Sequence, residues 1–361
     1  MTEPTYIPLR LHTEFSITDG MVRIKKLIAK AQEYGLPALG ISDLMNEFGL
    51  VKFYKACRSA GIKPVGAADV WIGNPNAPDK PFRAMLIIRN DAGYLRLSEL
   101  LTAAYVGKDR NVHHAELNPE WLENGDNSGL ICLSGAHYGE VGVNLLNGNE
   151  DAARAAALKY AAWFPDAFYL ELQRLPERPE WEACVSGSVK LAEELGLPVV
   201  ATHPTQFMSR DDFNAHEARV CIAGGWVLTD KKRPRDFTPS QFFIPPETML
   251  ERFADLPEAL ENTVEIAKRC NIHITLGKNF LPLFPTPDGL SLDDYLVKLS
   301  NEGLQERMVQ LYPDEAERAA KMPEYQERLD FELNIIIQMK FPGYFLIVQD
   351  FINWAKTHGC P

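Results

Sequence analysis

Short apolar runs alternate with amphipathic stretches from the start of the chain to about residue 272. The amphipathic stretches carry apolar residues at i, i+3 and i+4 spacing, so the alternation is typical of repeated βα units around a parallel sheet. The predicted strands are Tyr6–Leu11, Pro37–Ser42, Lys63–Trp71, Arg83–Arg89, Gly129–Ser134, Ala167–Gln173 and Pro198–Thr202. The predicted helices are Met21–Tyr34, Gly49–Ala60, Tyr94–Val106, Asp151–Trp163, Glu180–Leu195, Asp212–Ala223 and Leu256–Cys270.

The number of repeats decides between two sheet architectures. Seven predicted strands within about 200 residues are too many for a simple open sheet with short helices, and they suit a closed or nearly closed (β/α) barrel. An open, doubly wound sheet is the alternative. The chain has no G-x-G-x-x-G after a strand and no P-loop motif, so the nucleotide-binding forms of that alternative have no support. We therefore predict an α/β fold with a distorted (β/α) barrel of about seven strands.

A segment rich in proline and glycine, Ile272–Gly289, interrupts the alternation and marks a domain boundary. We predict one domain over residues 1–272 and a linker with the first helices of a second domain over residues 273–361. The helices expected there are Leu292–Leu311, Asp314–Lys321, Glu324–Met339 and Tyr344–His358. They have no sheet to pack on, so we expect them to be the first part of a domain that is truncated here.

Composition narrows the class of protein. A chain with 46% hydrophobic and 24% charged residues is an ordinary globular one. A net charge of −12 repels a polyanion, so this chain is not expected to bind nucleic acid strongly by itself. Six cysteines without a C-x-x-C pair argue against a zinc knuckle or a disulfide framework. No apolar stretch is long enough to span a bilayer, and the expected location is the cytoplasm.

Polar residues follow or end several of the predicted strands, where a βα barrel places its reactive groups. They include His12, Asp19, Asp43, Asp69, Ser134 and His203. Histidines and aspartates at strand ends suggest a metal-dependent hydrolase. However, two histidines and three aspartates would hold a single hard cation at best. Arg10 and Arg83 also place permanent positive charge where cations would have to bind.

Several motifs run from the N-terminal region to the last helix and cover essentially the whole chain. They are Leu9-Arg10-Leu11-His12-Thr13-Glu14-Phe15-Ser16 with Asp19-Gly20, Pro37-Ala38-Leu39-Gly40-Ile41-Ser42-Asp43, Gly61-Ile62-Lys63-Pro64-Val65-Gly66, Gly139-Glu140-Val141-Gly142, Leu197-Pro198-Val199-Val200-Ala201-Thr202, Ala215-His216-Glu217, Leu256-Pro257-Glu258-Ala259-Leu260-Glu261-Asn262-Thr263 and Phe341-Pro342-Gly343-Tyr344-Phe345-Leu346-Ile347-Val348. Together these motifs resemble the polymerase and histidinol phosphatase (PHP) domain that opens the alpha subunits of bacterial DNA polymerase III.

The resemblance implies a distorted barrel followed by the opening helices of a polymerase palm. In that family the nucleotide-binding stretch and the catalytic aspartates of the palm lie downstream of the segment that corresponds to residues 352–361. The full-length family members polymerise DNA with Mg²⁺ at those aspartates. This chain alone is therefore expected not to polymerise DNA, and whether it is an enzyme by itself stays open.

The resemblance also implies where a metal cluster would lie in active members of the family. His12 and Asp19 match the ligand pattern, and Asp69 stands where a glutamate is usual. Asp43 precedes a position that has lost its histidine. The positions that depart from the pattern are Arg10, Leu44, Arg83, Ala136, Pro204 and Gln206. Leucine, alanine and proline side chains cannot donate an electron pair to a metal, so we expect a vestigial site with no catalytic residue and no bound metal or other cofactor.

Loss of cations from a buried group of carboxylates would leave negative charge uncompensated. We predict that Arg10 and Arg83 restore neutrality through forked hydrogen bonds to Asp19, Asp43 or Asp69. His12 is then a hydrogen-bonded core histidine rather than a metal ligand. His203 is expected to be structural as well.

These expectations lead to a function. A barrel without its metal ligands fits a non-catalytic scaffold in a replicative polymerase. The resemblance implies that it docks the separate proofreading 3′–5′ exonuclease subunit, and that DNA is bound only through the full-length protein. The alternative is a metal-dependent phosphoesterase or an intrinsic 3′–5′ proofreading nuclease. A βα-barrel enzyme of unrelated chemistry has only the polar strand ends in its support. The surface that the exonuclease uses, the oligomeric state and any residual metal near His12 and Asp19 are not determined by the sequence.

Overall fold

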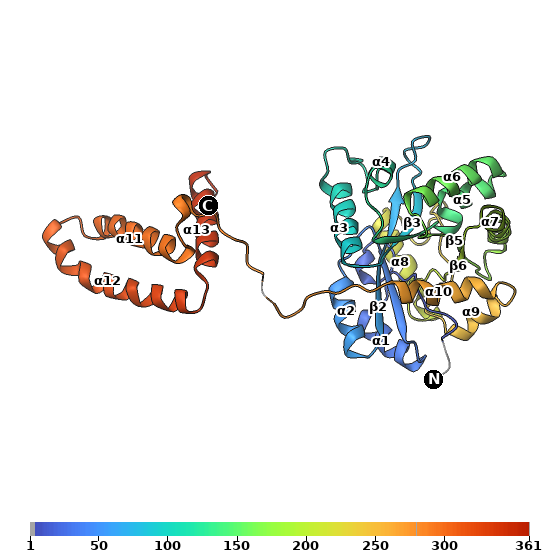
Figure 1. The fold of residues 1–361 in the computed structure, drawn as a ribbon, viewed down its shortest axis with the longest axis horizontal. Coiled ribbons are helices and arrows are strands. Elements are labelled where there is room, and N and C mark those ends of the chain that lie inside the picture. The colour runs from blue at the N-terminus through green and yellow to red at the C-terminus, as the bar shows by residue number, and fades with distance from the viewer. Residues whose placement is uncertain (1–3, 279, 361) are drawn as a thin grey trace. The chain divides into compact units, whose positions relative to one another are not determined.

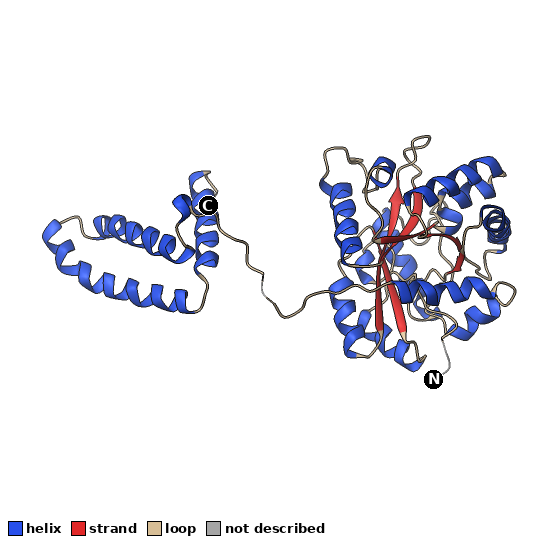
Figure 2. Ribbon diagram, in the orientation of Figure 1, coloured by secondary structure: helices blue, strands red, loops and turns tan. Residues whose placement is uncertain are grey.

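A curled sheet of six strands forms the frame of the first part of the chain (Figure 2). The computed structural model describes residues 4–278 and 280–360. The strands lie side by side in chain order: β1 (Ala38–Leu44), β2 (Lys63–Ile72), β3 (Phe82–Ile88), β4 (Leu130–Leu133), β5 (Phe168–Leu172) and β6 (Val199–Ala201). The sheet is a half-barrel enclosed by helices, so the predicted α/β class is confirmed.

The sheet is mixed rather than parallel. β1 pairs with β2, β4 with β5 and β5 with β6 in parallel, whereas β3 is antiparallel to both β2 and β4. The prediction of a parallel sheet was therefore wrong at β3. The loop between β2 and β3, residues 73–81, is too short for a helical crossover, and two strands joined by a short loop must run in opposite directions.

The first predicted strand, Tyr6–Leu11, is extended but is not a strand in the structure. The backbone N–H groups of Gly40 and Ser42 donate to the carbonyls of Pro8 and Leu11 at 2.7 and 2.9 Å. Pro8 has no N–H to donate in return, so a continuous ladder cannot form. On its other side, the N–H of His12 donates to the carbonyl of Thr205 at 2.9 Å. The segment therefore lies between the two ends of the curled sheet, and it places Arg10 and His12.

Helices surround the sheet (Figure 1). They are α1 (Ile24–Glu33), α2 (Leu50–Ser59), α3 (Asp91–Val106), α4 (Pro119–Glu123), α5 (Glu140–Leu146), α6 (Glu150–Trp163), α7 (Glu182–Leu195), α8 (Phe213–Gly224), α9 (Pro246–Arg252) and α10 (Pro257–Arg269). α2 contacts β2, α3 contacts β3, α6 and α7 contact β5, and α10 contacts β6. The long helices were predicted with small errors at their ends. α4, α5 and α9, of five to seven residues, were missed because so few residues show no repeat of the helical spacing.

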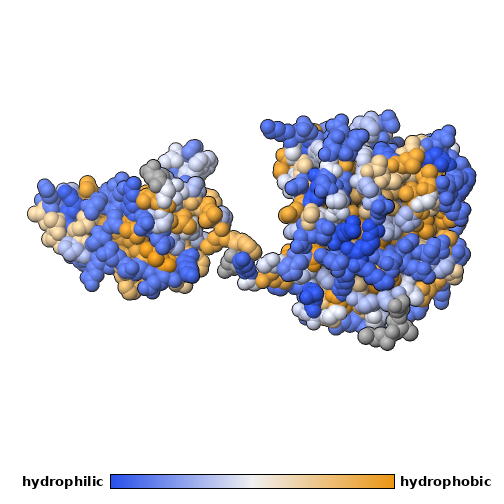
Figure 3. Space-filling view, viewed as in Figure 1, coloured by the Kyte–Doolittle hydropathy of each residue, from blue (hydrophilic) through white to orange (hydrophobic). Residues whose placement is uncertain are grey.

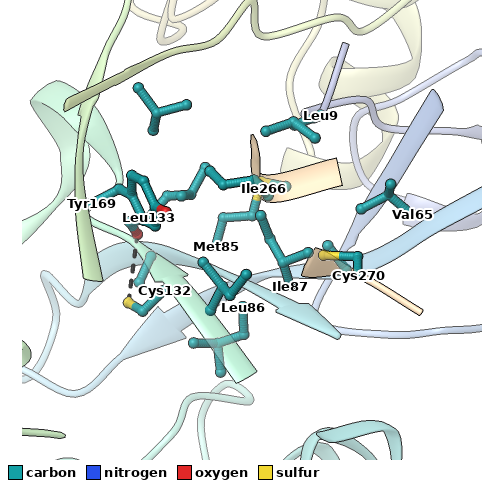
Figure 4. Close-up of a cluster of buried hydrophobic side chains, with 14 of the residues drawn as sticks. Leu9, Val65, Met85, Leu86, Ile87, Cys132, Leu133, Tyr169, Ile266 and Cys270 are labelled. Carbon is teal, nitrogen blue, oxygen red and sulfur yellow. Dashed lines mark hydrogen bonds between the residues drawn. The ribbon is translucent and has the colours of Figure 1, made fainter. Parts of the chain in front are cut away.

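The sheet and α10 enclose a continuous apolar core, part of which is shown in Figure 4. Met85 and Ile87 of β3 and Leu133 of β4 are fully buried, and Ile266 of α10 and Cys270, which directly follows that helix, lie against them. Cysteines in the described part of the chain are free, and all of them except Cys360 are buried. The core thus holds the strand ends that carry the polar residues in fixed positions.

The chain divides into two units, Met1–Ile274 and Thr275–Pro361. The second unit contains α11 (Leu292–Leu311), α12 (Glu315–Gln338) and α13 (Pro342–Thr357). Its small core is formed by Leu296, Leu333 and Leu346, one from each helix.

α12 replaces two predicted helices, Asp314–Lys321 and Glu324–Met339. The predicted break was wrong because Pro323 lies inside one continuous helix. A proline in this position removes one backbone hydrogen bond, and the hydrogen bonds of the turns on both sides continue the helix.

The surface of the second unit carries large apolar side chains among charged ones (Figure 3). Phe331, Met339, Phe351 and Trp354 are each more than half exposed. Within residues 4–278 and 280–360, no single helix has the length and apolar character needed to cross a membrane; α12 and α13 reach that threshold only as a pair bent by 116°.

Candidate functional site

The predicted site residues meet at one end of the curled sheet. Asp43 and Leu44 end β1, Asp69 lies near the end of β2, and Arg83 lies at the start of the antiparallel β3. Register places Leu44 opposite Asp69 and Trp71 opposite Arg83. Because β3 runs in the opposite direction, its first residues lie beside the last residues of its neighbours.

Arg10 occupies the centre of this group and points inward. Its Nε and Nη2 donate to the two carboxylate oxygens of Glu171 at 2.7 and 2.8 Å, and its Nη1 donates to Asp69. Its side chain is 7% exposed. Burial alone would lower the pKa of Arg10, but the Asp69 and Glu171 carboxylates raise it, so the guanidinium stays charged. The forked pair with Glu171 is the geometry that binds a carboxylate most specifically.

His12 links two carboxylates. Its Nδ1 lies 2.9 Å from Oδ2 of Asp19, and its Nε2 lies 3.0 Å from Oδ2 of Asp69. Burial alone would lower the pKa of His12, but the charges of Asp19 and Asp69 raise it to about 9. The imidazole is therefore protonated at neutral pH, and both ring nitrogens donate.

Arg83 completes the group. Its Nη2 donates to Oδ2 of Asp69 at 2.7 Å, and its guanidinium lies over the ring of Trp71 at 4.5 Å. Burial alone would raise the pKa of Asp69, but Arg10 and Arg83 hold it well below its usual range. We call this set of six residues the ion cluster: Arg10, His12, Asp19, Asp69, Arg83 and Glu171. It contains three cations and three carboxylates, so it is neutral when all six are charged.

Asp43 is held separately from the arginines. It accepts hydrogen bonds from the backbone N–H of Thr13 at 2.6 Å and from the hydroxyls of Thr13 and Ser16 at 2.8 Å. Burial raises its pKa, although the hydrogen bonds from Thr13 and Ser16 oppose this effect. The predicted pairing of an arginine with Asp69 agrees with the structure, whereas pairing with Asp43 or Asp19 does not occur.

Four further predicted positions surround the ion cluster or lie close to it. Leu44, Pro204 and Gln206 line a pocket of about 400 Å³ that also contains Arg10, His12 and Asp69. Nε2 of Gln206 lies 3.2 Å from Nδ1 of His12. Ala136 lies in a short 3₁₀ helix, η2 (Ala136–Tyr138), with a positive φ of 48°. None of these four side chains places a carboxylate, imidazole or thiol in the pocket.

Glu171 was missed from the sequence, although it binds Arg10 with both oxygens. It also accepts from the hydroxyl of Thr202 at 2.5 Å and from the N–H of Gly135 at 3.1 Å. The sequence did contain an indication of its role: Glu171 is the only charged residue of β5, a strand whose five residues are all buried. A charge within a fully buried strand requires a partner, and here the partner is Arg10.

Two further buried histidines, His203 and His137, have lowered pKa values. His203 lies between the carbonyl of Phe242, 2.9 Å away, and Nη1 of Arg252, 3.3 Å away. Burial and the charge of Arg252 lower its pKa to about 3. His137 stacks on Trp181 at 3.5 Å, and burial together with Arg10 and Arg83 lowers its pKa to about 3. Both rings are therefore neutral at neutral pH.

The donor set does not fit a cluster of two or three metal ions. Oδ2 of Asp69 accepts from Arg10, His12 and Arg83, and both oxygens of Glu171 accept from Arg10. A cation would have to displace a guanidinium to reach these oxygens. In the described part of the chain, no three or more His, Cys, Asp or Glu side chains are grouped so that they could hold a metal.

Two parts of the chain match known protein families. Residues 8–175 match the family described as PHP domain, and residues 294–361 match the family described as bacterial DNA polymerase III alpha NTPase domain. The first match covers the strands of the ion cluster through Glu171. The second covers α11–α13 apart from the first two residues of α11.

Whole-chain relatives agree with these matches. The chain is 98% identical over all 361 residues to DNA polymerase III subunit alpha of Neisseria meningitidis serogroup A, and it covers 32% of that protein. It is 48% identical over 360 residues, 99% of the chain, to DNA polymerase III subunit alpha of Pseudomonas fluorescens, covering 30% of it. The corresponding subunit of Escherichia coli O6:H1 is 47% identical over the whole chain, with 31% covered. The chain thus spans about a third of the length of these relatives.

Among solved structures, an amidohydrolase from Chromobacterium violaceum resembles the chain at a TM-score of 0.32 and 11% identity. The match covers 59% of this chain and 96% of the other. A likeness this low supports no conclusion about the site.

Proposed function

Because the chain belongs to the alpha subunits of bacterial DNA polymerase III and carries a PHP domain, we propose that its first unit is a metal-independent scaffold. In this proposal the ion cluster replaces the metal centre of active PHP domains, and the domain docks the proofreading exonuclease subunit. The whole protein polymerises DNA in the cytoplasm with Mg²⁺ bound outside this chain. The division into a PHP domain and the first helices of the palm is part of the same proposal.

One observation supports the scaffold over a hydrolase: Arg10 lies where a metal would have to bind. Each of its three nitrogens donates to Glu171 or Asp69, and these bonds are buried. A buried guanidinium cannot release its proton to make room for a cation, since the pKa of Arg10 is raised further by its partners. A nucleophilic water activated by metal would lack ligands at this position.

The competing function is the metal-dependent phosphoesterase or intrinsic proofreading nuclease. The observation in its favour is the pocket of about 400 Å³, which still opens beside His12, Asp19 and Asp69. A pocket beside strand ends is where a substrate would bind in an active barrel.

Metal content separates the two functions. The full-length subunit is dialysed against zinc, manganese and magnesium, and the metal that it retains is measured by elemental mass spectrometry. The measurement is repeated after proteolysis has removed the residues downstream of the first unit. The scaffold predicts no retained metal in the first unit and exonuclease binding that survives chelation. The hydrolase would be favoured over the scaffold if that unit retained two or three ions. It would also have to hydrolyse a phosphoester or single-stranded DNA, and a chelator would have to abolish that activity.

A further inference from the structure

The end of α8 and the chain that follows it expose four large apolar side chains within seven residues. The exposed fractions are 82% for Ile222, 40% for Trp226, 66% for Val227 and 45% for Leu228. Single exposed apolar residues are common on protein surfaces, whereas a contiguous group of them marks an interaction site. We call residues 222–235 the α8 turn.

The α8 turn is tied back to its helix rather than free. The N–H of Trp226 donates to the carbonyl of Cys221 at 2.8 Å, and the N–H of Asp230 donates to the carbonyl of Val227 at 2.9 Å. Below them, Arg233 forms a buried ion pair with Glu217 of α8 at 2.5 Å. Nε of Arg233 also donates to the carbonyl of Leu228 at 3.2 Å. A turn held in this way presents its side chains in one arrangement, which lowers the entropy cost of binding.

Gly224 shows how closely the turn is packed. A Cβ atom at this position would lie 2.7 Å from Cδ1 of Trp226, well inside van der Waals contact. The indole therefore lies against the backbone of α8, and its 40% exposure leaves the remaining face open. Trp226 and Arg233 also line the pocket of the ion cluster, so the turn forms part of its rim.

The edge of the α8 turn is basic. Lys231, Lys232 and Arg235 are exposed, and none of their side chains forms an ion pair within residues 4–278 and 280–360. Asp230 and Asp236 flank these three cations, so the edge carries a small excess of positive charge on a chain whose net charge is −12. Apolar anchors beside such a local excess of cations complement a partner that is apolar in its centre and acidic around it.

We propose that the α8 turn docks an acidic, amphipathic segment of a partner protein. Apolar side chains of the partner pack on Ile222, Val227 and Leu228, and its carboxylates face Lys231 and Lys232. This inference rests on the proposed function, which makes the exonuclease subunit the partner. It adds the surface and the chemistry that the surface recognises.

The test measures binding of the purified exonuclease subunit to the full-length alpha subunit by isothermal titration calorimetry. Val227→Ser combined with Leu228→Ser is expected to weaken binding about tenfold or more, because both apolar anchors are removed. Lys231→Glu combined with Lys232→Glu is expected to weaken it as well and to reduce its dependence on salt. Leu158→Ser is the matched control, since Leu158 is an equally exposed leucine (52%) on α6.

Each outcome decides something different. Wild-type binding that neither double variant changes would overturn the docking surface and leave the proposed exonuclease docking intact. Absence of wild-type binding would overturn both. Variants that melt at a lower temperature without losing the exonuclease would show that the rest of the alpha chain covers the turn. The double variants could instead lose affinity for a fluorescent oligo-dT while their exonuclease binding stays unchanged. That result would make the turn a binding site for single-stranded DNA and would also overturn the proposal.

Discussion

At the scale of single residues, Asp69 is the carboxylate on which the ion cluster depends. One of its oxygens accepts from Arg10, His12 and Arg83. Removing several charges from water is costly, and the cost is repaid only when every charge has partners in good geometry. Glu171 supplies two further acceptor oxygens for Arg10. The loss of one member would therefore leave an uncompensated buried charge.

Glu171→Gln tests this dependence. The substitution keeps the shape of the side chain but removes one of the three negative charges, so the free energy of unfolding should fall by roughly 3–5 kcal/mol. Urea denaturation followed by circular dichroism measures the change. Glu182→Gln removes a carboxylate from an exposed pair with Arg174 and should cost less than about 1 kcal/mol. Equal losses in the two variants would contradict the role of the ion cluster.

The protonated His12 predicts a pH dependence. Its folded-state pKa of about 9 lies above the ordinary value of 6.5, so folding favours the bound proton. Its contribution is complete below pH 6.5 and is lost as the pH rises to about 9. The shift corresponds to a stabilisation on the order of 3 kcal/mol.

The free energy of unfolding is measured for wild type and His12→Gln between pH 6.5 and 9. These measurements show whether the contribution of His12 falls or rises with pH. The difference between the two proteins should shrink as the pH rises through the window. The pKa values of His137 and His203 are lowered to about 3, so these residues change the stability only below pH 6.5. They do not affect the stability between pH 6.5 and 9. A difference that grows with rising pH would show that His12 is neutral in the folded protein.

At the scale of elements, the first turn of α3 lies against the residue that precedes β4. A Cβ atom on Gly93 would lie 1.8 Å from the carbonyl oxygen of Gly129, and one on Gly129 would lie 2.3 Å from the nitrogen of Gly93. Asn90 caps the helix by accepting from the N–H of Gly93 at 3.0 Å. Two glycines thus bring a helix and a strand to backbone contact, which fixes where β4 enters the sheet.

Gly93→Ala and Gly303→Ala form a matched pair. The first should lower the free energy of unfolding by about 1–3 kcal/mol, because a methyl group meets backbone that cannot move aside. The second lies in the exposed middle of α11 with no atom within 4 Å of its Cβ position. It should stabilise the second unit by about 0.5–1 kcal/mol, since alanine is the better helix former. The denaturant midpoint of each variant shows whether it is more or less stable than wild type. A stabilising Gly93→Ala would contradict the backbone contact.

At the scale of the whole molecule, the chain is two units with separate cores. Their cores share no residue: the first contains residues of the sheet and of α1–α7, α9 and α10, and the second is formed by Leu296, Leu333 and Leu346. Between them, residues 275–278 and 280–286 form neither helix nor strand. Backbone without secondary structure is the preferred target of proteases.

Limited trypsin digestion should therefore cut first after Lys278, which is exposed, and release two fragments identified by mass spectrometry. Lys231 and Lys232 are exposed as well, but the Glu217–Arg233 ion pair holds the α8 turn and should slow cleavage there. Lys278→Gln should delay the first cut without changing the melting temperature. A first cut within the α8 turn would mean that this turn opens more readily than the link between the units.

A site residue could be predicted where its own position in the sequence marks it, and not where its role depends on a partner that is distant in the chain. Arg10 and Arg83 stand out in sequence as charges at strand ends, and they were predicted to pair with Asp19, Asp43 or Asp69. The structure pairs both with Asp69. Glu171 was missed because its partner is 161 residues away and no local spacing connects them. Asp43 was one of the three aspartates offered to the arginines. Its actual donors, Thr13 and Ser16, become its neighbours only when the first segment lies along β1.

By itself, the sequence determined the α/β class, the positions of the long helices of the first unit and the family. These properties follow from spacing and motifs that are local in the chain. Only the tertiary structure decided that β3 runs antiparallel, that Tyr6–Leu11 bridges the sheet without becoming a strand, and that six charges balance in one cluster. These depend on which backbone groups and charges meet across the fold, and a buried charge is stable only beside the partner that folding brings to it.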